Sequence, residues 1–190
     1  MTHWGVPFGL AALSLLFEAG GDSARLWLRF DRAGIAAGEW WRLLSGHLVH
    51  LGVSHMLLNV IALLLLWWLV GAGLSVAGWL LVVAVSVACI DLGLWLLDST
   101  LSWYVGMSGL LHGLFAAGLI ARRRSAPLES LVLGALLGTK LLFEQLAGPL
   151  PGSEASAGGA VVVNAHLYGA VGGIAAALGL RASVRASLPI

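Results

Sequence analysis

The sequence predicts an all-α integral membrane protein built around six transmembrane helices. Of its 190 residues, 59% are hydrophobic and only 10% are charged, and apolar runs recur along the whole chain. Soluble domains carry roughly 25% charged residues, and a helix that crosses a bilayer needs about 20 apolar residues. Six such helices would use about 120 residues. The composition therefore indicates one membrane domain in contact with lipid, without room for a soluble module.

The charge balance argues against a nucleic-acid partner. Ten basic and nine acidic residues provide no strong positive field to recruit a polyanion. The single cysteine, Cys89, excludes an intrachain disulfide framework and a multi-cysteine metal site. We expect no cofactor and no bound metal.

Six apolar segments are predicted to span the bilayer. The first lacks the basic leading region and the small-residue cleavage site of a secretory signal peptide, so we expect it to be retained as a helix. The fourth has only about 15 residues, so its start should lie below the membrane surface. The predicted spans are residues 4–19, 55–72, 76–97, 106–120, 128–146 and 165–180.

The first loop and the basic residues indicate how the chain sits in the membrane. Residues 20–54 mix charged side chains with tryptophans, which suits a partly helical loop at the membrane surface. Arg122-Arg123-Arg124 lies between the fourth and fifth spans, and Arg181 and Arg185 follow the sixth. Because cytoplasmic loops are rich in Lys and Arg, both termini are expected to be cytoplasmic.

Ionisable and strongly polar side chains inside a bilayer are functional candidates because their burial is costly. A small transporter or channel that uses Asp91, Lys140 and Glu144 is one interpretation. However, Lys140 and Glu144 are four residues apart and can pair with each other, and the sequence lacks repeated broken helices. The candidates are Glu18, His55, Asn59, Asp91, His112, Lys140, Glu144 and His166.

A glycine-flanked serine opens the fourth span, in Gly106-Met107-Ser108-Gly109. A serine at a helix start lies near free backbone N–H groups, and those groups favour a developing negative charge. Glycine and serine are also common where membrane helices pack closely. The motif therefore indicates a nucleophile only if a base lies nearby.

Small residues predict that the fourth and sixth helices pack closely. This packing would bring a base close to the serine. They recur every four residues in two stripes, Gly109-Gly113-Ala117 and Gly169-Gly173-Ala177. Such stripes let two backbones approach each other. The packing would bring Ser108 and His166 together at one depth, where His166 would take the serine proton and Ser108 would attack a carbonyl.

His55 and Asn59 share one face of the second span, where an imidazole and an amide can donate to an oxyanion. The same pair can also be a simple interhelical hydrogen-bond pair. A metal site is a weaker interpretation, because no His-Glu-x-x-His motif is present. That site would combine His47, His50 and His55 with His112 or His166.

Together these motifs resemble rhomboid intramembrane serine proteases. The resemblance covers about residues 39–180 and implies a six-helix core with the serine on the short fourth helix and the histidine on the sixth. The motifs, in order, are Trp40-Trp41-Arg42-Leu43-Leu44, His50, His55, Asn59, Gly106-x-Ser108-Gly109 and Ala165-His166-x-x-Gly169-x-x-x-Gly173.

The resemblance implies a role for each matching residue. Ser108 would be the nucleophile and His166 the general base. The oxyanion hole would combine the backbone N–H of Ser108 with the side chains of His55 and Asn59. Gly106, Gly109 and Gly169 would support the site, and His50 would support the first loop. The scheme has no third carboxylate, so Asp91 and Glu144 are not assigned to a triad.

One departure points to a subfamily. Many bacterial rhomboids place a tyrosine four residues after the nucleophile, where this chain has His112. The form Ser108-Gly109-Leu110-Leu111-His112-Gly113 resembles the rhombosortase subfamily. His112 would pack on and orient His166, or assist it as a second imidazole.

The subfamily resemblance also implies a substrate. It implies cleavage of membrane-anchored secreted proteins at a Gly-Gly-type motif near the periplasmic face of a bacterial inner membrane, with or without transfer to a new anchor. The alternative function is a non-catalytic rhomboid-like scaffold or chaperone for membrane clients.

Overall fold

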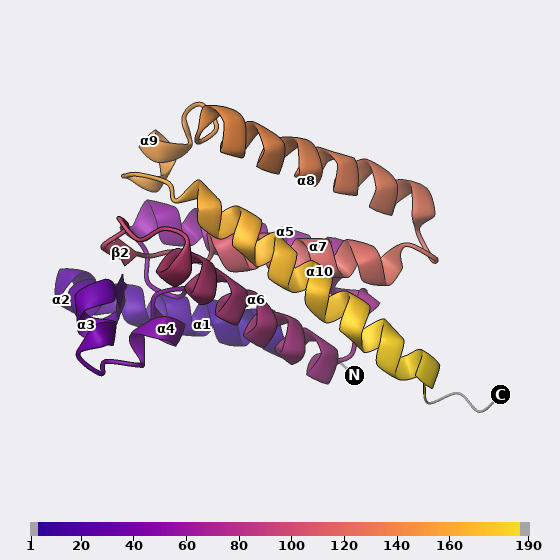
Figure 1. Ribbon diagram of the computed structural model, residues 1–190, viewed down its shortest axis with the longest axis horizontal. Helices are drawn as coiled ribbons and strands as arrows, with labels where there is room; N and C mark the ends of the chain where they lie inside the picture. Colours follow the sequence, from indigo (N-terminus) through magenta and orange to yellow (C-terminus); the bar gives the residue numbers. More distant parts are fainter. Residues whose placement is uncertain (1–3, 187–190) are drawn as a thin grey trace.

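The computed structural model describes residues 4–186, with side chains described through residue 181, as a bundle of long helices with short helices at one end (Figure 1). The long helices are α1 (Gly5–Ala19), α5 (Val53–Val70), α6 (Val76–Leu96), α7 (Ser108–Arg122), α8 (Pro127–Ala147) and α10 (Val163–Ala186). The short elements are α2 (Gly21–Leu28), β1 (Phe30–Asp31), α3 (Arg32–Ala36), α4 (Arg42–Ser45), η1 (Gly71–Gly73), β2 (Trp103–Tyr104) and α9 (Ser153–Ala157).

The helices confirm a helical membrane protein. In the described part of the chain, four segments are long and apolar enough to cross a membrane: α5 together with η1, α6, α8, and α10 up to Arg181. The helices α1 and α7 are apolar but have 15 residues each. A count of six spans therefore stays a prediction.

Helix α7 begins at Ser108, two residues later than the predicted span. Gly106 has φ +117°, which lies outside helical geometry and favours glycine. The backbone N–H of Gly106 donates to the carbonyl of Gly46 at 3.1 Å, and the Tyr104 hydroxyl donates to the Gly106 carbonyl at 2.6 Å. These contacts hold the strand-like approach to α7 against the first loop.

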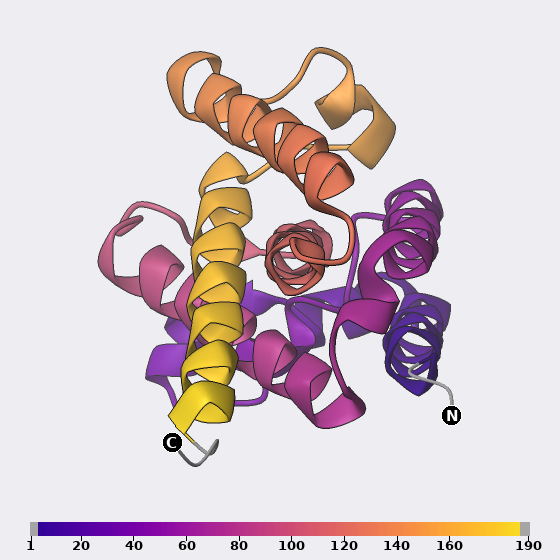
Figure 2. The same ribbon diagram turned by 90° about the vertical axis from the view of Figure 1, so that its right-hand side faces the viewer.

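Helix α7 lies at the centre of the bundle and packs closely on α10 (Figure 2). A Cβ on Gly169 would collide with the carbonyl of Gly109, and one on Gly173 would collide with the carbonyl of Gly113. The two backbones thus touch where the glycine stripes predict contact. This packing places the first turn of α7 beside the first turn of α10.

Helix α8 lies at the edge of the bundle, against α7 and α10 (Figure 2). In the described chain, Glu144 is its only buried residue. Most of its apolar side chains point outward, which suits contact with lipid tails. The most exposed of them are Leu128, Leu131, Leu136, Leu142 and Leu146.

The first loop is partly helical, as predicted, but it also carries a strand. Phe30 pairs with Tyr104 and Asp31 with Trp103 in a two-residue antiparallel sheet, a small addition to a fold that is otherwise helical. Arg32 joins this loop to the end of α6 and to the segment after it by donating to four carbonyls, those of Leu94, Trp95, Asp98 and Leu101. The position of this loop at a membrane surface stays a prediction.

Candidate active site

Ser108 and His166 lie within hydrogen-bonding distance at the adjoining ends of α7 and α10. The Ser108 hydroxyl is 2.9 Å from Nε2 of His166. Ser108 is half-buried, and His166 is only 5% exposed. The predicted juxtaposition of the two residues is present, and its distance suits proton transfer from the serine to the imidazole.

The other nitrogen of His166 contacts Glu144, which the sequence analysis did not assign to the site. Nδ1 of His166 is 3.0 Å from Oε2 of Glu144. Because a carboxylate only accepts, Nδ1 carries the proton, and Nε2 keeps a lone pair for the serine hydroxyl. The fold therefore places a carboxylate of α8, which the sequence did not assign to the site, beside the predicted base.

Lys140 lies one turn before Glu144 on α8 and pairs with it, as their spacing predicts. Its Nζ donates to Oε1 of Glu144 at 2.7 Å. The same Nζ is 3.5 Å from Nδ1 of His166. Since both of these nitrogens carry protons, this second contact is electrostatic and not a hydrogen bond.

His112 stacks on His166. The ring centroids are 4.2 Å apart and the planes are inclined by 18°. Nδ1 of His112 donates to the Ser108 carbonyl at 2.7 Å, one turn earlier on α7. This geometry suits packing and orientation of His166, the first of the two roles considered for His112.

His55 lies against Gly106, close to the start of α7. A Cβ on Gly106 would come within 2.9 Å of Cε1 and 3.2 Å of Nε2 of His55, so the missing side chain makes room for the imidazole. Nδ1 of His55 accepts from the N–H of Leu51 at 3.3 Å. The ring proton therefore sits on Nε2, which can donate to an oxyanion.

Asn59 lies one turn after His55, and its side-chain amide has two hydrogens to donate. Its Nδ2 donates one hydrogen to the carbonyl of His55 at 2.9 Å. An amide nitrogen has two hydrogens, and Asn59 is almost fully buried but lines the same cavity as Ser108. The second hydrogen can therefore serve the site.

A cavity of about 500 Å³ joins these groups. Its polar lining is formed by His55, Asn59, Tyr104, Ser108, His112, Lys140, Glu144, Ser153, Ser156 and His166. Its other walls are apolar side chains of α5, α7 and α8, among them Leu58, Leu66, Phe115 and Leu137. The cavity thus passes between α5 and α8, with the reactive pair at its polar end.

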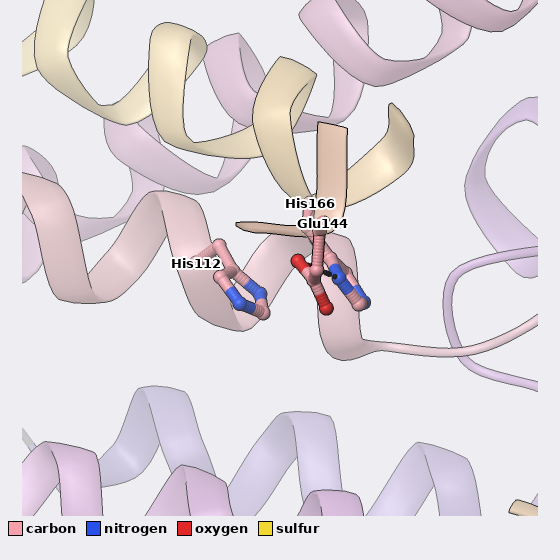
Figure 3. A group of neighbouring side chains, drawn as sticks. All are labelled: His112, Glu144 and His166. Carbon is pink, nitrogen blue, oxygen red and sulfur yellow. Dashed lines mark hydrogen bonds and ion pairs between the residues drawn. The ribbon is translucent and has the colours of Figure 1, made fainter. Parts of the chain in front are cut away.

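The side chains do not gather as the metal interpretation requires. His47 contacts Asp91 at 3.1 Å, and His50 packs edge-on against His55 with a centroid distance of 5.0 Å. Among the described residues, the group with metal-like spacing is His112, Glu144 and His166 (Figure 3). The in-plane lone pairs of two nearly parallel, stacked rings do not converge on one ion.

His50 is buried in the first loop with little polar support. In the described part of the chain, neither ring nitrogen has a hydrogen bond of normal geometry, although the Leu48 carbonyl lies nearby. Burial, with a smaller contribution from His55, lowers the pKa of His50 from 6.5 to about 3. The folded protein therefore requires a neutral imidazole at this position.

We predict that His50 makes the fold acid-sensitive. Below pH 6.5 the unfolded chain binds a proton that the folded chain rejects, so stability falls as the pH drops from 6.5 toward 3. The cost is about 1.4 kcal/mol per pH unit, or roughly 2 kcal/mol at pH 5. Thermal unfolding in detergent at pH 7 and pH 5 should show a smaller acid-induced loss in His50→Gln than in wild type. Equal losses would contradict the prediction.

The fold and the site define a class: a helical membrane protein with a hydrogen-bonded serine–histidine pair at the end of a cavity. The Rhomboid domain family model matches residues 37–183. The chain therefore belongs to the rhomboid family, a family of intramembrane serine proteases.

A curated relative supports this membership. The chain is 34% identical over 108 residues to the "Putative rhomboid protease YdcA" of Bacillus subtilis (strain 168). The matched region is 55% of this chain and 54% of that protein, so the chain spans about half the length of this relative.

Proposed function

We propose that this chain is an intramembrane serine endopeptidase that cleaves membrane-anchored proteins. The observation that carries the proposal is the 2.9 Å contact between the Ser108 hydroxyl and Nε2 of His166. Its support is the rhomboid family model, which matches residues 37–183. A serine is a weak nucleophile until a base accepts its proton, and His166 is placed to be that base.

In the proposed mechanism, His166 takes the hydroxyl proton while Oγ of Ser108 bonds to the scissile carbonyl carbon. The oxyanion is held by the N–H of Ser108 and by donors from His55 and Asn59. The amine then leaves with the proton from His166, and an acyl-enzyme remains. Water, or an amine that carries a new anchor, attacks the acyl group and frees Ser108.

The cavity between α5 and α8 suits an apolar substrate segment. Its apolar walls can hold a stretch of transmembrane chain, while the carbonyl to be cleaved reaches Ser108. Such a stretch must leave its helix to expose a carbonyl, which glycine makes less costly. With the Ser108–Gly113 resemblance to rhombosortases, this supports Gly-Gly-type anchor signals as substrates.

The location is part of the proposal. The arginines at 122–124 follow α7 at the end opposite Ser108. Under the positive-inside rule that end is cytoplasmic. Ser108 and His166 would then open to the periplasmic side of a bacterial inner membrane, with both termini in the cytoplasm.

Labelling with a fluorophosphonate probe in detergent tests the proposal. Attack by Ser108 on phosphorus expels fluoride and leaves a stable ester, so we expect wild type to be labelled. Ser108→Ala removes the nucleophile and His166→Ala removes its base, so neither variant should be labelled. A folded wild-type protein that is not labelled would favour the alternative function, a non-catalytic scaffold for membrane clients.

A further inference from the structure

The contacts of His166 give α8 a part in the site beyond lining the cavity. We propose that Glu144 is a positioning residue for His166 and that Lys140 holds its carboxylate, so that α8 completes a Ser108–His166–Glu144 relay. This inference rests on the proposed function, because it concerns activation of the same serine.

The direction of the hydrogen bonds at His166 supports this role for Glu144. Glu144 accepts from Nδ1 of His166 at 3.0 Å, and Nε2 is 2.9 Å from the Ser108 hydroxyl. The carboxylate thereby selects the tautomer in which Nε2 can accept a proton. It also stabilises the imidazolium that forms when the serine is deprotonated.

The burial of Glu144 also supports this role. Glu144 is 3% exposed, although α8 buries no other residue in the described chain. A buried carboxylate is costly unless it is paired and hydrogen-bonded. Here both oxygens are used, one by His166 and the other by Lys140.

Lys140 and Glu144 have opposite effects on the stability of the His166 imidazolium. The carboxylate stabilises a positive charge on His166, whereas the ammonium, 3.5 Å from Nδ1, repels it. The other polar residues that line this cavity are His55, Asn59, Tyr104, Ser108, His112, Ser153 and Ser156. His55 is neutral because its Nδ1 accepts a hydrogen bond, and His112 presents its ring face. The two charged side chains of α8 therefore dominate the charge balance at His166.

The test is the rate of fluorophosphonate labelling between pH 5 and pH 9. In Glu144→Gln we expect the maximum rate to fall about a hundredfold or more. The pH of half-maximal labelling should move down by about one unit or more, because the imidazolium loses its partner. In Lys140→Met that pH should move up. Glu129→Gln, an exposed position on the same helix beside Arg122, is the matched control and should change neither quantity.

The outcomes separate this inference from the proposed function. The relay would be supported if the pH of half-maximal labelling moved in opposite directions in Glu144→Gln and Lys140→Met, and if both variants unfolded at the same temperature as wild type. Partial recovery of the labelling rate in Glu144→Asp would also support it. Wild-type rates and profiles in Glu144→Gln, or movements in the same direction in both variants, would overturn it. A wild type that is not labelled would overturn the proposed function, and the relay with it.

Discussion

Ser108→Ala should lower the rate of substrate cleavage by about four to six orders of magnitude, the loss seen when a serine nucleophile with a histidine base is removed. The alanine leaves the oxyanion donors and the cavity intact, so the remaining rate would come from binding and orientation alone. The measurement is cleavage, in detergent or liposomes, of a model protein that carries Gly-Gly before a single transmembrane anchor.

The fold should not change in this variant. Ser108 is half-buried, and among the described residues its hydroxyl has one hydrogen-bond partner, His166, so we expect thermal unfolding close to that of wild type. Cleavage by folded Ser108→Ala at more than a tenth of the wild-type rate would show that another group is the nucleophile.

Gly173→Val should disrupt the bundle. A Cβ at this position would collide with the Gly113 carbonyl and lie 2.7 Å from the Gly113 Cα. The obstacle is backbone, which cannot rotate away as a side chain can. We therefore expect a loss at or above the upper end of the usual overpacking cost, about 3 kcal/mol. Thermal unfolding in detergent measures this loss.

The same change should also stop probe labelling, because α10 carries His166 and would be pushed away from α7. Gly138→Val on α8 is the matched control, since a Cβ there meets nothing within 4 Å. It introduces the same β-branched residue into a helix at a position with open space. If Gly173→Val were as stable as this control, the close contact of the two backbones would not be a main source of stability.

The helical segments and their central packing could be predicted from the sequence. Long apolar runs mark helices by length and composition, and glycine stripes on the fourth and sixth runs predict the contact of α7 with α10. The short pairing of Phe30 with Tyr104 could not be predicted, because two residues carry no periodic signal and the partners are far apart in sequence.

Some of the site residues could be predicted from the sequence, and others could not. Ser108 and His166 stand at helix starts with small residues beside them, so local sequence indicates both the nucleophile and its neighbour. The contact of His47 with Asp91 was not foreseen, since it joins the first loop to α6 through the fold alone. The contact gives a partner to Asp91, a half-buried acid that the sequence left open to a transport function.

Glu144 was missed for a specific reason. Its spacing from Lys140 predicts a pair on one helix, and this pair forms. Spacing within a helix does not determine which face meets a neighbouring helix, so the approach to His166 had no signal of its own.

The glycine contacts between α7 and α10 determine the distance between the reacting atoms. A helix rises about 1.5 Å per residue, and the tolerance of a hydrogen bond is about half an ångström. A slip of one residue between the two backbones would therefore separate the oxygen of Ser108 from Nε2 of His166. Because the carbonyls of Gly109 and Gly113 set the register directly, lipid-facing side chains elsewhere can vary without altering the distance between the reacting atoms.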